Sequence, residues 1–226
     1  MTEQPAKIWK RLTKKLQGEL GYFRSELAFA AAYRKIKGIE GLLVKGQERW
    51  LFDAARSLPR RATIVEIGAY LGRSTACLGL GCKGTETHIF SIDLFGGVYD
   101  DVRNSPSRKK FDRNFLGHWQ ENMGSLGVLN YVTPIQGDSK QVAKSWKDPI
   151  HMLFIDGSHK FEDVIDDFRN FFPYVVNGGI VGIHDVTPSW PGPYKAWHEM
   201  IVHCLEDVGY CASIGYGKRL RAGCPR

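Results

Sequence analysis

Residues 63–75 read TIVEIGAYLGRST, a short apolar run that contains a carboxylate and leads into two glycines. The β-branched residues of this run predict a buried strand, Thr63–Ile67. Gly68 and Gly72 let the chain turn sharply and bring its backbone close to a ligand before a helix begins. A strand, a glycine turn and a helix in this order are typical of the first unit of a parallel α/β sheet.

The alternation of strand and helix continues along the chain. Further apolar runs predict the strands His88–Leu94, Tyr131–Gln136, His151–Ile155 and Gly179–His184. Helical periodicity predicts the helices Gln47–Leu58, Ser74–Cys82, Phe111–Met123, Lys140–Trp146 and Phe161–Phe171. Residues 211–223, CASIGYGKRLRAG, predict two strands around a glycine-containing turn. The expected fold is therefore a doubly wound, mostly parallel α/β sheet of seven strands that closes with a C-terminal β-hairpin.

Residues 1–40 are predicted to be a helical extension in front of a domain formed by residues 41–226. Residues 1–61 hold 14 Lys and Arg against 6 Asp and Glu, whereas the rest of the chain holds 17 against 18. A uniformly basic nucleic-acid-binding domain is therefore not expected. An amphipathic helix with a basic flank is predicted from apolar residues at every fourth position, Ile8, Leu12, Leu16 and Leu20. This helix could pack on the domain, or it could dock on an anionic membrane or a lipid-linked substrate.

Cysteine spacing and hydropathy indicate the cellular compartment in which the protein is expected. The five cysteines form no C-x-x-C pair, which predicts free thiols in a reducing compartment. No run of about 18 apolar residues occurs, and the first residues do not resemble a signal peptide. We therefore expect a soluble, cytoplasmic protein.

Acidic residues lie at the ends of the first three predicted strands. Glu66 belongs to the first strand, Asp93 ends the second, and Asp138 follows the third. In a parallel sheet these ends share one edge, where ligands bind. Asp93 could accept hydrogen bonds from ribose hydroxyls and Asp138 from an adenine amino group, or each could cap a turn or a helix. Glu66 suits a cationic amino acid tail better than a pyrophosphate, and G-x-G-x-x-G is not met in this register.

Carboxylates and imidazoles follow the fourth and fifth predicted strands: Asp156 and His159 after one, His184 and Asp185 after the other. Asp and His are poor core residues unless they are paired, so four of them together indicate a function. Carboxylates suit Mg²⁺ or Mn²⁺, and an imidazole shifts the preference towards softer ions. His159 could accept a proton at neutral pH, or it could cap the helix that begins near Phe161.

In combination, the motifs VEIGAYLGRST, SIDLF, GDS, FIDGSHKFEDVIDD and GGIVGIHD resemble the class I S-adenosylmethionine (SAM)-dependent methyltransferases. The sequence is similar to the bacterial group that contains antibiotic-sugar O-methyltransferases, over about residues 40–222. The resemblance implies a Rossmann-like fold and methyl transfer from SAM to a hydroxyl of a sugar or another natural product. It implies cofactor contacts from Glu66, Gly68, Ala69, Tyr70, Gly72, Ser74, Asp93, Gly137, Asp138, Ser139 and Asp156.

The resemblance also implies a divalent metal such as Mg²⁺ at Asp156 and Asp185, beside which His184 is a candidate third ligand. The proton affinity of an imidazole makes His159 the candidate catalytic base. His184 departs from the family pattern, in which an acidic or Asn ligand is usual, so it could be a ligand, a proton acceptor or a partner of Asp185.

Residues 95–110 are predicted to form a lid, and residues 187–194 an aromatic wall or rigid packing. A small-molecule acceptor is expected, and a homo-oligomer is left open.

Three other functions fit parts of the sequence. A nicotinamide-linked dehydrogenase would share the fold, but it needs a third glycine in register and a Tyr-x-x-x-Lys pair. A metal-dependent hydrolase could use Asp156, His159, His184 and Asp185, which leaves the glycine turn unexplained. A non-catalytic SAM-binding subunit that docks on a membrane or a partner is the third.

Overall fold

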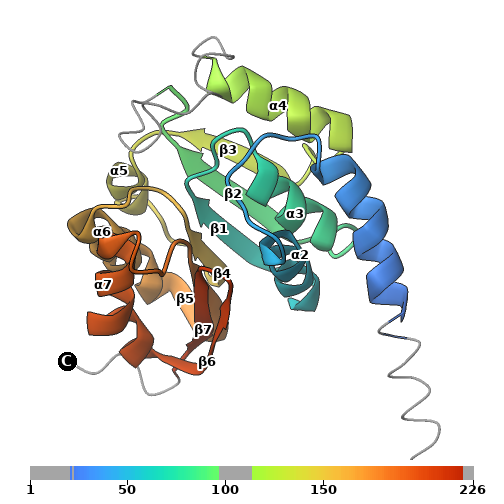
Figure 1. Cartoon of the computed structure of the whole chain (residues 1–226). Helices are drawn as coiled ribbons and strands as arrows, with labels where there is room; N and C mark the ends of the chain where they lie inside the picture. Colours follow the sequence, from blue (N-terminus) through green and yellow to red (C-terminus); the bar gives the residue numbers. More distant parts are fainter. Residues whose placement is uncertain (1–20, 22, 97–113, 221–226) are drawn as a thin grey trace, which may run out of the picture.

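The computed structural model describes residues 21, 23–96 and 114–220. One sheet has the strand order β3-β2-β1-β4-β5-β7-β6 (Figure 1). Its strands are β1 (Thr63–Ile67), β2 (His88–Asp93), β3 (Val132–Gln136), β4 (Ile150–Ile155), β5 (Val175–Ile183), β6 (Leu205–Cys211) and β7 (Ile214–Arg219). Strands β1 to β5 pair in parallel, and β7 pairs antiparallel with β5 and β6. The predicted fold class is confirmed.

The strand order reverses between β1 and β4, and this reversal positions the site. Ile67 of β1 pairs with Ile92 of β2 and with Ile155 of β4, which in turn pairs with Ile183 of β5. The residues that follow these four isoleucines therefore meet at one edge of the sheet. In open α/β sheets ligands bind at such a reversal point.

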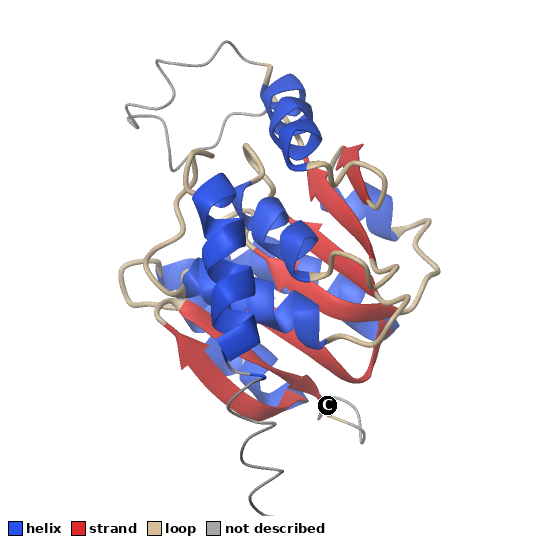
Figure 2. Ribbon diagram, turned by 90° about the vertical axis from the view of Figure 1, so that its right-hand side faces the viewer, coloured by secondary structure: helices blue, strands red, loops and turns tan. Residues whose placement is uncertain are grey.

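Helices cover both faces of the sheet (Figures 1 and 2). One face packs against α2 (Gln47–Ser57), α3 (Arg73–Gly81) and α4 (Phe115–Leu126). The other face packs against α5 (Ser139–Ala143), α6 (Phe161–Phe171) and α7 (Pro191–Glu199). Two short 3₁₀ helices complete this side, Phe172–Tyr174 and Ile201–Cys204. Burial on both faces explains why the central strands are apolar throughout.

Residues 23–36 form a helix that packs on the domain. The ring of Phe29 meets the ring of Phe52 edge-on, and Ile36 is fully buried in the same core. Phe23 and Leu27 lie on the outer side, 60% and 56% exposed. The predicted amphipathic helix of residues 1–20 lies outside the described residues, and the domain boundary at residue 40 stays a prediction.

The C-terminal hairpin differs from the prediction. Its turn lies at Ala212 and Ser213, not at a glycine, and Ala212 takes the left-handed conformation with φ 50°. Gly215 and Gly217 lie within β7, where close neighbours leave no room for a side chain. A Cβ at Gly215 would approach the Trp197 ring to 2.9 Å. Glycine is therefore present at these two positions because neighbouring side chains pack closely there, and not because the chain turns. Helix α7, which begins within residues 187–194, was not predicted.

Three of the cysteines are free thiols: Cys77, Cys82 and Cys211. Cys204 takes part in a disulfide bond, so the prediction of free thiols is wrong for this residue. Sequence spacing does not reveal which thiols the fold brings together. Among the described residues, no helix is both long and apolar enough to cross a membrane.

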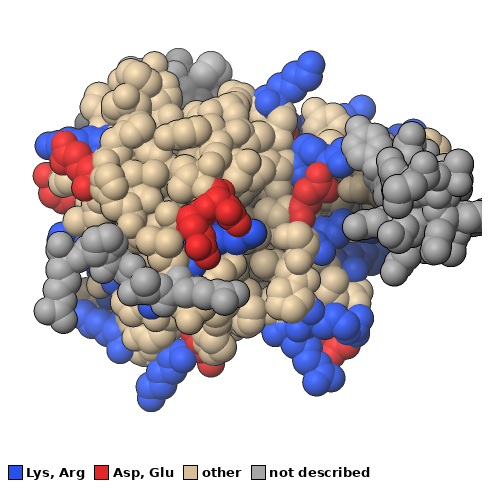
Figure 3. All heavy atoms as spheres, turned by 90° about the horizontal axis from the view of Figure 1, so that it is seen from below, with Lys and Arg blue, Asp and Glu red and all other residues tan. Residues whose placement is uncertain are grey.

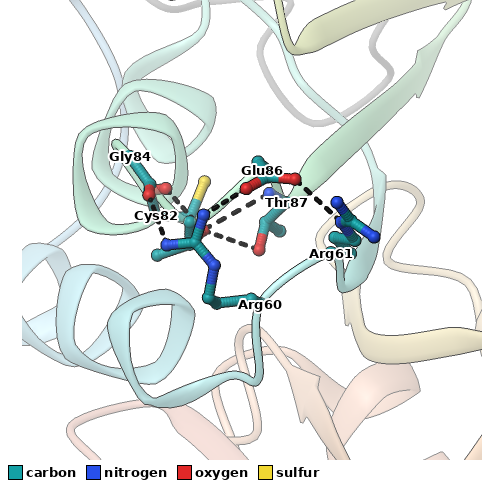
Figure 4. A network of polar contacts seen from close by, with 7 residues as sticks. Arg60, Arg61, Cys82, Gly84, Glu86 and Thr87 are labelled. Atoms are coloured by element: carbon teal, nitrogen blue, oxygen red, sulfur yellow. Dashed lines mark hydrogen bonds and ion pairs between the residues drawn. The ribbon is translucent and has the colours of Figure 1, made fainter.

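At the opposite edge of the sheet, two turns are tied together (Figure 4). Arg60 and Arg61, just before β1, both bind the carboxylate of Glu86, just before β2. Arg61 Nε lies 2.8 Å from Glu86 Oε2, and Arg60 also donates to the carbonyl oxygen of Gly84. These residues are exposed and lie at the amino ends of the strands, away from the ligand edge.

Charge on the lower face of the molecule is mixed. In Figure 3, the described Lys and Arg side chains lie in several separate groups, with Asp and Glu side chains between them. This distribution agrees with the near balance of charge after residue 61.

Candidate active site

The glycine turn after β1 lies against the end of β4. Gly68 has φ 88°, and a Cβ at this position would come within 2.1 Å of the carbonyl oxygen of Asp156. Gly72, with φ 89°, is the N-cap residue of α3, and a Cβ at this position would come within 2.7 Å of Met123. Both positions therefore require glycine, because of conformation and because of space.

The carboxylate of Asp93 holds this turn. Its Oδ2 accepts hydrogen bonds from the backbone N–H groups of Ala69 (2.8 Å) and Tyr70 (2.9 Å). Its Oδ1 accepts from the N–H of Phe95 at 2.7 Å. Asp93 therefore caps this turn, which is one of the two roles that the sequence left open for it. These three bonds fix the backbone at both ends of the site edge, after β1 and after β2.

Two adjoining pockets open at this edge of the sheet. The first is lined by Gly68, Ala69, Tyr70, Ser74, Asp93, Asp156, His159, His184 and Asp185, together with residues 40–43, Arg73 and Gly157. The second is lined by Gly68, Asp93, Gly137, Asp138, Ser139 and Asp167, among others. Nearly all of the predicted site residues thus come together, and Gly68, Asp93 and Gly157 belong to both pockets. Gly72 instead packs against α4.

Glu66 lies in neither pocket wall and is fully buried. Its Oε2 accepts hydrogen bonds from Thr75 Oγ1 (2.5 Å) and Ser91 Oγ (2.6 Å). Burial raises the pKa of Glu66 to about 7, although the surrounding hydroxyl groups oppose the shift. The structure therefore buries this carboxyl group between β1, β2 and α3, and its predicted contact with a cofactor stays a prediction.

This buried carboxyl group should make stability depend on pH. A carboxyl pKa that is higher in the folded state disfavours folding once the unfolded chain ionises. Relative to Glu66→Gln, the wild-type free energy of unfolding should fall by about 3 kcal/mol between pH 4.5 and pH 7.5 and then level off. Urea unfolding of both proteins across this range measures the difference. A constant difference would show that Glu66 ionises equally in both states.

The second pocket contains an acidic residue that was not predicted. Asp138 caps α5, which is one of the two roles that the sequence left open for it, and it accepts a hydrogen bond from the N–H of Lys140 at 2.7 Å. Ser139 donates its hydroxyl hydrogen to Asp167 of α6. Burial raises the pKa of Asp167 to about 6. Its position on the otherwise apolar stripe of α6, between Val164 and Phe171, is the sequence signal that could have revealed it.

Carboxylates and imidazoles converge in the first pocket. His184 Nδ1 lies 2.9 Å from Asp156 Oδ1 and 3.2 Å from Asp185 Oδ2. One ligand atom from each of these residues lies within 4.8 Å of the others. Burial alone would lower the pKa of His184, but the two carboxylates raise it to about 10. A proton on His184 therefore balances part of the negative charge at neutral pH.

His159 reaches the same cluster from the loop before α6. Its Nε2 lies 3.1 Å from Asp185 Oδ2, and its ring lies 4.1 Å from the ring of Trp190. The residue that caps α6 is Lys160, so the capping alternative for His159 is not observed. Burial would raise the pKa of Asp185, but His159 and His184 hold it well below its ordinary value. Within the stretch predicted as an aromatic wall or rigid packing, Trp190 packs on the imidazole of His159.

Comparison with known families identifies the domain. A family model described as "Methyltransferase domain" matches residues 65–186, more than half of the chain. The chain belongs to the methyltransferase domain family. The matched residues run from β1 to the turn after β5, and they include the strand ends that line the two pockets. Uncharacterized protein y4gI of Sinorhizobium fredii (strain NBRC 101917 / NGR234) is 26% identical over 155 residues. That match covers 67% of this chain but 16% of y4gI.

Solved methyltransferases share the fold. The O-methyltransferase NovP is 16% identical with a TM-score of 0.61, over 78% of this chain and 80% of NovP. The O-methyltransferase TomG from Streptomyces achromogenes, solved in complex with SAM, is 16% identical with a TM-score of 0.59, over 87% and 89% of the two chains. The calicheamicin methyltransferase CalS11 is 19% identical with a TM-score of 0.58, over 76% and 77%. At these identities the likeness concerns the methyltransferase fold.

Proposed function

We propose that this methyltransferase domain transfers the methyl group of SAM to a hydroxyl group of a small molecule, a sugar or another natural product. One observation carries the proposal: Asp156, His159, His184 and Asp185 line the same pocket as the glycine turn and Asp93. A methyl donor held at the turn would therefore share a pocket with groups that can handle the proton of an acceptor. NovP and TomG, which are described as O-methyltransferases, support oxygen as the acceptor atom.

The roles of the residues follow from their positions. SAM supplies an activated methyl group, so alignment of the acceptor oxygen provides most of the rate enhancement. The turn residues Ala69 and Tyr70, fixed by Asp93, would face the amino acid part and the ribose. Asp138 and Ser139 in the second pocket would face the adenine. His159, oriented by Asp185 and Trp190, would accept the hydroxyl proton.

The cluster also fits a divalent cation. Two carboxylates and one imidazole nitrogen form a suitable donor set, and their ligand atoms already lie close together. We propose Asp156, His184 and Asp185 as its ligands. A cation here would orient an acceptor oxygen and lower its pKa. His184 takes the place of the acidic or Asn ligand that is usual in the family.

A metal-dependent hydrolase is the second candidate function, and the same cluster favours it. Such an enzyme would not need a tight glycine turn tied to Asp93, nor a second pocket with a capped helix. Co-purification separates the two functions. Mass spectrometry of the native protein should find SAM or its demethylated product, and neither molecule is expected in a hydrolase. A cytoplasmic location stays a prediction.

Asp93→Ala should weaken SAM binding. The change removes a charged acceptor and three hydrogen bonds that hold the turn. We expect SAM affinity to fall by about 1.5–3 kcal/mol, the size of a charged hydrogen-bond loss. Isothermal titration calorimetry measures the change, and Asp207→Asn on the exposed edge strand serves as the control. Equal affinities for wild type and Asp93→Ala would remove Asp93 from the site, and preference for NAD over SAM would overturn the proposed function.

The N-terminal extension is proposed to contact an anionic membrane surface. The sequence spacing of apolar residues in 8–20 continues to Phe23 and Leu27, which face outward on the described helix. Removing residues 1–20 should abolish sedimentation with anionic vesicles and leave SAM binding intact. Added salt should weaken vesicle binding of the whole chain. A full chain that stays in the supernatant at low salt would contradict membrane docking.

A further inference from the structure

Gln47 connects the region before the sheet to the candidate cation site. It is the first residue of α2 and is fully buried. Its Oε1 lies 3.1 Å from His184 Nε2, a contact between residues 137 positions apart. No motif in the sequence pointed to this residue. A buried amide needs partners for both its oxygen and its nitrogen, so its full set of contacts decides what it does.

The orientation of the Gln47 amide follows from its other contacts. The backbone N–H of Val44, which can only donate, lies 2.8 Å from Oε1. The amide nitrogen donates to Ser213 Oγ at 2.9 Å. Oε1 is therefore the acceptor on the His184 side, and His184 Nε2 must carry a hydrogen and donate it. This assignment holds for either protonation state of the ring.

The other ring nitrogen is thereby directed to the carboxylates. Nδ1 faces Asp156 Oδ1 and Asp185 Oδ2. The opposite oxygen of Asp185 accepts from Ser213 Oγ at 3.3 Å. Gln47 and Ser213 together thus support both His184 and Asp185 from outside the cluster. In a metal-binding histidine, one ring nitrogen usually binds the metal while the other ring nitrogen donates its hydrogen to an oxygen.

We propose that Gln47 is a positioning residue that makes Nδ1 of His184 the ligating atom, and that this nitrogen ligand gives the site a preference for Mn²⁺ and softer cations over Mg²⁺. The inference rests on the cation site of the proposed function. Imidazole nitrogen suits transition-metal ions, whereas Mg²⁺ favours oxygen ligands. Loss of an outer hydrogen-bond partner usually weakens metal binding about 10- to 100-fold.

The test compares Gln47→Met, which keeps the length of the side chain but removes the amide oxygen, with the wild type. Mn²⁺ binding is followed by the electron paramagnetic resonance signal of free Mn²⁺, with Mg²⁺ as competitor. Gln47→Met should bind Mn²⁺ about 10- to 100-fold more weakly and discriminate less against Mg²⁺. Gln47→Glu keeps an oxygen acceptor and should retain binding. Gln141→Met, on the exposed side of α5, should match the wild type.

A second readout needs no variant. Nitrogen NMR of the Zn²⁺-loaded wild type should show His184 with a hydrogen on Nε2 and the metal on Nδ1. Metal on Nε2, or unchanged Mn²⁺ affinity in a folded Gln47→Met, would overturn the role of Gln47. A wild type that binds no Mn²⁺ or Zn²⁺ would overturn the inference together with the cation site. Calorimetry with SAM then shows separately whether methyl-donor binding survives.

Discussion

His159→Ala should lower the turnover of a genuine acceptor about 10²- to 10⁴-fold, the usual contribution of a general base. The imidazole lines the pocket that also holds the glycine turn, and Asp185 and Trp190 fix its orientation. A base must be neutral to accept a proton, so the wild-type rate should fall as the pH is lowered. The variant should lose this acidic limb. Steady-state kinetics with SAM and acceptor across pH 5–9 measure both effects.

Two further variants separate proton transfer from positioning. His159→Asn keeps a group that can donate to Asp185 but cannot accept the proton at neutral pH. A base role predicts that this variant is as slow as His159→Ala. Recovery of the wild-type rate in His159→Asn would leave His159 as a positioning residue only. His198→Ala, an exposed histidine on α7 outside both pockets, is the matched control and should leave turnover unchanged.

Asp185→Asn should lower turnover about 100-fold or more, and a chelator should do the same to the wild type. A cation that polarises the acceptor oxygen supplies several kcal/mol, and each 1.4 kcal/mol corresponds to about tenfold in rate. Asparagine also tolerates the left-handed conformation that Asp185 adopts (φ 57°), so the variant tests charge rather than backbone strain. Both treatments should largely spare SAM binding, because the proposed cation would contact the acceptor and not SAM.

The response to added metal distinguishes the two mechanisms. Mn²⁺ should restore the chelated wild type but should not rescue Asp185→Asn. Full activity in excess chelator, with the His159 effect present, would eliminate the cation and leave a base alone. Near-normal rates in both Asp185→Asn and His159→Ala would make the cluster structural and would contradict the site assignment. Thermal unfolding of each variant checks that the fold is intact.

Much of the fold was predictable because its signals are local. The strand Thr63–Ile67 and the helix Phe161–Phe171 match the predicted bounds, since hydrophobic spacing reports directly which face of an element is buried. The hairpin was misplaced because Gly215 and Gly217 lie within β7, where Trp197 and Leu205 exclude a side chain. Sequence does not distinguish a glycine that turns the chain from a glycine that makes room for a neighbour.

By itself, the sequence determined the order of strands and helices and the polar residues at the ends of β1 to β5. Parallel pairing then requires those ends to meet, which is why Asp93, Asp156 and Asp185 could be assigned to one site. Only the tertiary structure decided that Glu66 is buried outside both pockets, that Asp93 binds the turn, and that Gln47 reaches His184. These relations depend on the direction of side chains from distant segments. Hydrophobic periodicity specifies burial along one element, but it carries no information about which buried polar atoms of different elements will face each other.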